Sequence, residues 1–213
     1  VQLVLNKLFP QTEDLGVPLT YYDDIEEPVG ILAKFIEKDK TIGIDKNWPA
    51  RFLLKLQDLG AGSKFVNGSV IVDKVRQIKD EHERQIMRES AKMIDEVMDK
   101  LIPWVAKGLT ERELNAKCVE LCKEVGFQGL SFDPITAYGK GGADPHHVTD
   151  DSKGKYGDSV VLDIGGMWNN YASDTTRTVF IGEINDRQRE VYNVVLEANK
   201  RGIAAAKPGN NMS

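Results

Sequence analysis

The sequence predicts an α+β fold, in which a small α/β region precedes a unit of two helices, a block of strands and a third helix. Three observations support this prediction. Strand-like and helix-like apolar patterns alternate over residues 1–75. Two helical patterns with N-terminal capping signatures follow, before residue 126. Strand-like segments then dominate residues 132–181, and one more helical pattern begins near residue 186.

The first region, residues 1–75, is expected to form an α/β domain. Apolar residues at helical spacing lie between residues 49 and 59, and that helix stops at Gly60. The apolar run Val70-Ile-Val72 is strand-like. We therefore expect strands at residues 1–5, 41–45, 64–66 and 70–73, and helices at 25–38 and 49–59.

The second region, residues 76–213, begins with two capped helices. Asp80 with Glu83 forms a capping-box pattern, and the apolar stripe behind it runs to Leu101 before Pro103. Thr110 repeats the pattern three residues before a second glutamate, and its stripe ends at Gly126. We expect helices over residues 80–101, 110–125 and 186–206, with the strands of residues 132–181 between the last two.

Composition excludes several classes of protein. The 213 residues are 41% apolar and 29% charged, as in ordinary globular proteins. A net charge of −5 without a basic cluster argues against nucleic-acid binding. No apolar run approaches the ~18 residues of a membrane span, and no secretory signal is present, so a cytoplasmic protein is expected. Cys118 and Cys122 are expected to be buried free thiols rather than half of a zinc site.

Two aspartates stand eleven positions apart around a turn. Asp163 follows the apolar run Val160-Val-Leu162, and Asp174 opens the returning segment. Opposing residues of a hairpin lie within about 5.5 Å, where two ionised carboxylates repel unless they share a proton or a divalent cation. Oxygen ligands suit Mn²⁺, Mg²⁺ or Ca²⁺, and also Co²⁺ or Zn²⁺ when a histidine joins. The alternatives are a turn-forming Asp163 and an Asp174–Arg177 ion pair.

Two of the three histidines lie in the glycine-containing segment 141–148. His146 and His147 follow Asp144-Pro145, a context typical of an irregular loop. Histidine titrates near neutral pH and can carry a proton or stabilise an oxyanion, although loop histidines are more often simply solvated. His82 lies among acidic neighbours in the first capping box and is assigned to the solvated face.

Three motifs in this order resemble the pita-bread metallopeptidases. They are Gly142-Ala-Asp-Pro-His146, Tyr156-Gly-Asp-Ser-Val-Val-Leu-Asp163-Ile-Gly and Tyr171-Ala-Ser-Asp174-Thr-Thr-Arg-Thr178. The match is greatest with the proline-specific members, the Xaa-Pro dipeptidases and Xaa-Pro aminopeptidases. The resemblance implies that residues 76–213 form the first half of the catalytic domain and residues 1–75 part of the α/β domain before it.

The resemblance also implies roles for individual residues. Asp163 matches a ligand of one metal ion, and Asp174 matches the aspartate that bridges two. His146 matches the histidine that contacts substrate and helps to stabilise the tetrahedral intermediate. His147 occupies a variable position and is a weaker candidate for substrate binding. The implied cofactors are two divalent ions, with Mn²⁺, Co²⁺ and Zn²⁺ as the candidates.

The implied function is metal-dependent hydrolysis of Xaa-Pro bonds in proline-containing peptides by a cytoplasmic homodimer. In the family, a histidine and two glutamates from the second half complete the metal site, and no histidine follows His147. We therefore expect an internal piece of a longer enzyme that is inactive alone. An Xaa-Pro aminopeptidase and a non-catalytic pita-bread binding module remain alternatives. A metal-free creatine hydrolase is disfavoured, because such enzymes lack the two aspartates.

Overall fold

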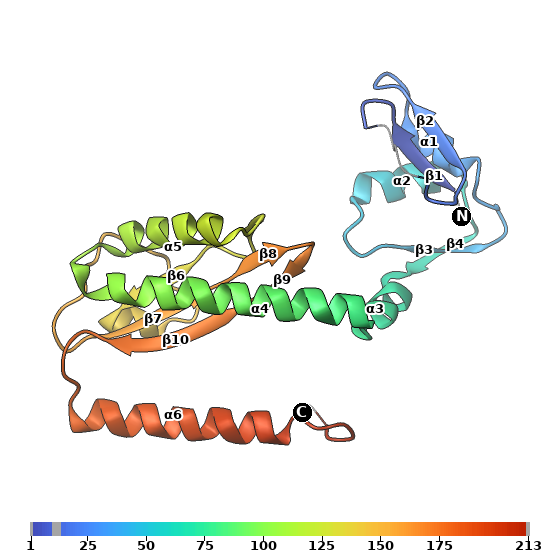
Figure 1. Cartoon of the computed structure of the whole chain (residues 1–213). Coiled ribbons are helices and arrows are strands. Elements are labelled where there is room, and N and C mark those ends of the chain that lie inside the picture. The colour runs from blue at the N-terminus through green and yellow to red at the C-terminus, as the bar shows by residue number, and fades with distance from the viewer. Residues whose placement is uncertain (1, 10–13, 212–213) are drawn as a thin grey trace. The chain divides into compact units, whose positions relative to one another are not determined.

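The structure, a computed structural model, describes residues 2–9 and 14–211. The chain divides into two compact units, Val1–Lys79 and Asp80–Ser213, and both are drawn in Figure 1. The mixed α/β architecture agrees with the predicted fold class. The first predicted strand is present from Leu3, while Val1 lies outside the described residues.

The first unit contains two pairs of parallel strands and short helices. A small core around Val29, Leu56 and Ala61 holds it together. Strand β3, helix α2 and strand β4 form a βαβ unit, because a parallel pair needs a crossover connection. Its elements are β1 (Leu3–Asn6), β2 (Leu19–Tyr22), α1 (Pro28–Ala33), β3 (Thr41–Ile44), α2 (Ala50–Asp58), β4 (Lys64–Asn67) and α3 (Ser69–Gln77).

The strand predicted at residues 70–73 is wrong, because this segment lies within helix α3. The Asn67 side chain accepts a hydrogen bond from the Ser69 N–H at 3.0 Å, and the Ser69 hydroxyl donates to Asp45 at 2.9 Å. These bonds turn the chain immediately after β4. Val70 and Ile71 are 50% and 73% exposed, and among the described residues no strand pairs with this segment to favour an extended conformation over the helix.

The predicted helices of the second unit are present. Both predicted capping boxes form, with Asp80 and Thr110 as the N-caps, and Asn185 with Gln188 forms a third. Pro103 does not end the helical path, because it fits the first turn of a 3₁₀ helix that continues from α4. The bounds are α4 (Glu81–Leu101), η1 (Ile102–Lys107), α5 (Glu111–Val125) and α6 (Asp186–Ala205).

Two antiparallel sheets share one bent hairpin in the second unit. The bend separates β7 from β8 at Gly165 and β9 from β10 at Ser173. Asn169 and Asn170 have φ of 46° and 66°, which is the geometry of a tight type I′ turn. The sheets have the orders β10-β7-β6 and β5-β8-β9. Their elements are β5 (Gly129–Leu130), β6 (Ile135–Tyr138), η2 (Gly139–Ala143), β7 (Ser159–Ile164), β8 (Gly166–Trp168), β9 (Tyr171–Ala172) and β10 (Thr175–Phe180).

Helices α4 and α5 pack against one face of the β10-β7-β6 sheet (Figure 1). That face carries Val160, Leu162 and Ile164 of β7, all fully buried. The intervening residues of β7 point to the opposite face and are only half-buried, since side chains alternate along a strand. Cys118 and Cys122 are buried free thiols in the helix–sheet core, as predicted.

Candidate metal and substrate site

Asp163 lies on the sheet face that the helices leave uncovered. It pairs in register with Thr176 of β10, and the Thr176 hydroxyl donates a hydrogen bond to Asp163 Oδ1 at 2.7 Å. The carboxylate is half-buried at the end of β7. One of its oxygens is therefore held in place by a neutral donor, and no ion pair joins the carboxylate to a cationic side chain among the described residues.

Asp174 lies immediately before β10, two residues from Thr176. Because side chains alternate along an extended chain, we expect the Asp174 side chain on the face of Thr176 and of Asp163. Asp174 is exposed. Arg177 forms its ion pair with Asp95 of α4 at 3.6 Å, on the helix side of the sheet, rather than with Asp174.

The start of the segment that carries His146 lies on the same sheet face. Gly142 lies against Val161, the residue of β7 that shares a face with Asp163, since a Cβ on Gly142 would stand 2.9 Å from Val161 Cγ2. His146 is exposed, and its N–H donates to Asp144 Oδ1 at 2.9 Å. Within the described residues, no hydrogen bond or ion pair joins His146 to either aspartate.

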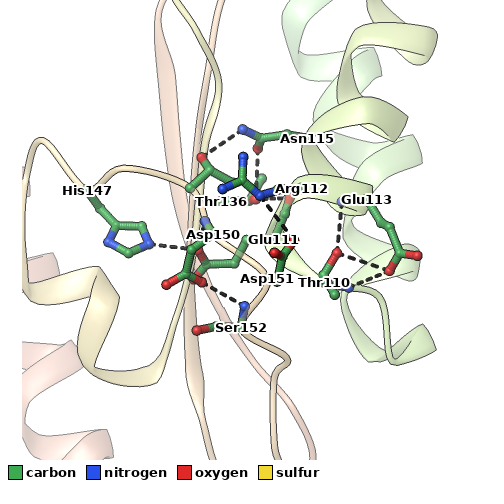
Figure 2. A network of polar contacts seen from close by, with 11 residues as sticks. Thr110, Glu111, Arg112, Glu113, Asn115, Thr136, His147, Asp150, Asp151 and Ser152 are labelled. Atoms are coloured by element: carbon green, nitrogen blue, oxygen red, sulfur yellow. Dashed lines mark hydrogen bonds and ion pairs between the residues drawn. The ribbon is translucent and has the colours of Figure 1, made fainter.

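His147 points to a residue that the sequence analysis did not select. Its Nε2 lies 2.7 Å from Glu111 Oε2, and Figure 2 shows the ring directed at this carboxylate. Glu111 is only 1% exposed. Its Oε1 accepts the N–H of Tyr138 at 3.0 Å, and its Oε2 also accepts the N–H of Asp150 at 3.0 Å. Burial, followed by the charge of Glu111, raises the pKa of the Tyr138 hydroxyl.

Neighbouring residues of α5 extend this network (Figure 2). Asn115 donates to the Thr149 hydroxyl at 2.9 Å and accepts from Thr136 at 2.8 Å. The hydroxyl and N–H of Ser152 hydrogen-bond Asp150 and lower the pKa of its carboxyl. The start of α5 is therefore tied to both β6 and the segment that follows His147.

The chemistry of the donors fits part of a divalent metal site. Asp163 and Asp174 have no cationic partner among the described residues, and their carboxylates are hard oxygen ligands of the kind that Mn²⁺ accepts. Three or more His, Cys, Asp or Glu side chains do not come together in a metal-binding arrangement within residues 2–9 and 14–211. In the same part of the chain, every helix is too short or too polar to cross a membrane.

Comparison with known proteins decides the family. The model of metallopeptidase family M24 matches residues 85–213. The chain belongs to family M24. The N-terminal domain of creatinases and prolidases matches residues 10–78, so the two domains occur in the expected order. The M24 region includes both aspartates and both loop histidines, and it supports divalent metal ions as cofactors of the family.

Two of the relatives are named Xaa-Pro dipeptidases. The chain is 33% identical over 197 residues to an Xaa-Pro dipeptidase of Pyrococcus horikoshii, which covers 92% of this chain and 55% of the relative. It is 32% identical to the Xaa-Pro dipeptidase of Pyrococcus furiosus, with coverage of 92% and 56%. The chain thus spans about half the length of the curated relatives it matches.

Solved structures of peptidases have a similar fold. A Pyrococcus horikoshii dipeptidase matches with a TM-score of 0.87 at 31% identity, covering 94% of this chain and 57% of that one. An X-Pro aminopeptidase from Thermotoga maritima matches with a TM-score of 0.82 at 27% identity, covering 97% and 60%. The chain therefore has the mixed α/β fold of these peptidase structures, with the family M24 region over residues 85–213.

Proposed function

We propose that this chain supplies part of the active site of an Xaa-Pro dipeptidase, which hydrolyses the bond before a proline in short peptides. The observation that carries the proposal is the position of Asp163 on the uncovered sheet face, with Asp174 two residues before its register partner Thr176 and Gly142 of the His146 segment against Val161 of the same face. The dipeptidase names of relatives that are 32–33% identical over 197 residues support it.

Each residue has a definite task in this proposal. Asp163 and Asp174 hold the divalent ions, and the Thr176 hydroxyl fixes the orientation of the Asp163 carboxylate. When bound, the ions supply a water of lowered pKa and polarise the peptide carbonyl. His146 donates a hydrogen bond to the substrate oxygen that gains negative charge, for which its exposed ring on the loop is suited.

The described residues offer two carboxylates but no third ligand beside them. A site for two ions needs more oxygen and nitrogen ligands than two aspartates provide. We therefore propose that the remaining ligands come from outside these residues, and that the 213-residue chain alone binds Mn²⁺ weakly and does not cleave Xaa-Pro dipeptides.

Paramagnetic broadening by Mn²⁺ tests the assignment on the full 213-residue chain, independently of turnover. We expect NMR signals to broaden around residues 163 and 174, and Asp163→Asn or Asp174→Asn to abolish most of the effect. Asp95→Asn is the matched control, because Asp95 lies on α4 and faces Arg177. Broadening that survives both site variants would overturn the metal assignment, while tight binding of two ions or clear dipeptide cleavage would overturn the proposed incompleteness.

Xaa-Pro aminopeptidase activity is the second candidate, favoured by the structural match to the Thermotoga maritima enzyme. The two activities differ in whether the substrate extends beyond proline. Assays of the enzyme with all ligands present, on Xaa-Pro and Xaa-Pro-Xaa peptides, separate them. A homodimer and the choice of Mn²⁺ or Co²⁺ stay predictions from the resemblance, and a cytoplasmic location stays a prediction from the sequence.

A further inference from the structure

The segment that carries His146 is long for a connection inside a compact unit. Residues 139–158 join β6 to β7 with η2 as their only described helical turn. Connections longer than about 12–15 residues are uncommon and are mobile unless side chains or backbone groups tie them down. An exposed histidine on such a segment needs anchors on both sides of it to have a fixed position.

Glu111 anchors this segment at three points, of which one lies just before it and two lie within it. Its carboxylate binds the Tyr138 N–H just before the segment, the His147 ring in its middle and the Asp150 N–H beyond. Burying a carboxylate is costly unless hydrogen bonds compensate for the lost water, and bonds to a charged acceptor are stronger than neutral ones. These three bonds compensate for the burial of the Glu111 carboxylate, since the residue is only 1% exposed.

The His147 ring is confined from a second direction. A Cβ on Gly141 would stand 3.0 Å from His147 Cε1, so the ring lies directly over this glycine. The ring therefore sits between the start of the loop and the buried carboxylate. His146, the next residue along the chain, is exposed and has only its backbone N–H bound within the loop.

We propose that Glu111 and His147 form a clamp that positions His146 over the sheet face of Asp163. Glu111 is then a positioning residue, and His147 acts by holding the loop rather than by touching the substrate. The catalytic purpose of the clamp rests on the proposed function of His146. The clamp itself is a property of the free chain, and it needs neither metal nor substrate.

The chain has three histidines, which makes an NMR test direct. His82 on α4 is exposed and serves as an internal reference. Glu111→Gln replaces one of two bonded oxygens by an NH₂ group, which leaves at least one N–H of the network without an acceptor. We expect altered ring signals for His147 and His146, and backbone order parameters of residues 144–149 falling from about 0.85 to below about 0.6. The His82 signals should not change.

Two pairs of variants separate positioning from general destabilisation. Glu113→Gln is the matched control for Glu111→Gln, because Glu113 lies in the same helical turn but is exposed and bonded to Thr110. His147→Gln keeps an N–H donor for Glu111 and should preserve the order of the loop. His147→Phe fills similar space without a donor and should loosen it, even if Glu111→Gln fails to fold.

Unchanged order parameters in both Glu111→Gln and His147→Phe would overturn the clamp. Loosening by His147→Gln as great as that by His147→Phe would also overturn it, since the hydrogen bond would not be the cause. Neither result depends on Mn²⁺, so failure of the clamp and failure of the metal assignment are seen separately.

Discussion

Replacing Gly165 by alanine tests the close approach of strands beside Asp163. Gly165 forms the bend between β7 and β8. A Cβ at this position would lie 2.1 Å from Ser131 Oγ, 2.3 Å from the Ser173 carbonyl oxygen and 2.7 Å from Phe132 Cε1. The φ of Gly165 is not positive, so the predicted cost is steric and not conformational.

The size of the expected loss in stability depends on which atoms a Cβ at residue 165 would meet. Overpacking a well-packed site costs typically about 1–3 kcal/mol, and flexible side chains keep the cost low by rotating away. The Ser173 carbonyl is backbone and cannot rotate, and the Ser131 hydroxyl is bonded to it at 2.8 Å. We therefore expect Gly165→Ala to lower the free energy of unfolding of the second unit by about 3 kcal/mol. Displacement of Ser173 would also move Asp174 and weaken Mn²⁺ binding.

Urea unfolding followed by tryptophan fluorescence measures this loss. A Trp48→Phe background leaves Trp104 and Trp168, both in the second unit, as reporters. Gly129→Ala in β5 is the control, because a Cβ there meets nothing within 4 Å, and its change should stay within about 0.5 kcal/mol. If Gly165→Ala is as stable as this control, the close approach of strands at the bend is refuted.

Two further predictions concern α6 and the core. Gly202→Ala should stabilise α6 by about 0.5–1 kcal/mol, because Gly202 is inside the helix and a Cβ there meets nothing within 4 Å. Helical circular dichroism during urea unfolding measures this gain. A loss of stability would contradict the prediction. Cys118 and Cys122 should react with a thiol reagent more than roughly 100-fold more slowly in the native chain than in urea, since access needs opening of the core. The hydrogen bond with Cys122, together with burial, also raises the pKa of the Cys118 thiol, and fast reaction of either cysteine in the native chain would contradict this prediction.

Much of the second unit could be predicted because its signals are local. A capping box needs only an N-cap residue and an acceptor three positions later, and the boxes at Asp80 and Thr110 formed as predicted. The burial of the two cysteines as free thiols could be predicted from their helical spacing alone. Residues 70–73 could not be predicted in this way, since apolar β-branched residues favour a strand only when a neighbouring strand is available.

The candidate site could be predicted only in part from the sequence. The sequence analysis placed Asp163 and Asp174 opposite each other, whereas the two-residue turn at Asn169 and Asn170 pairs Asp163 with Thr176. The fixed position of His147 could not be predicted from the sequence, because it depends on a contact with Glu111, 36 residues away in the chain. No pattern within the loop itself indicates that contact.

Glu111 and Glu113 show why such a residue escapes sequence analysis. Both lie in the first turn of α5, where acidic residues are common because they favour the positive end of the helix dipole. Glu113 fits that local explanation, since it is exposed and caps its own helix through Thr110. Glu111 has the same local environment in sequence but is 1% exposed, because helix α5 begins where β6 ends and the His147 segment passes. The difference between the two glutamates is therefore tertiary: the same residue type in the same turn serves as a helix cap at one position and as the anchor of a loop at the other.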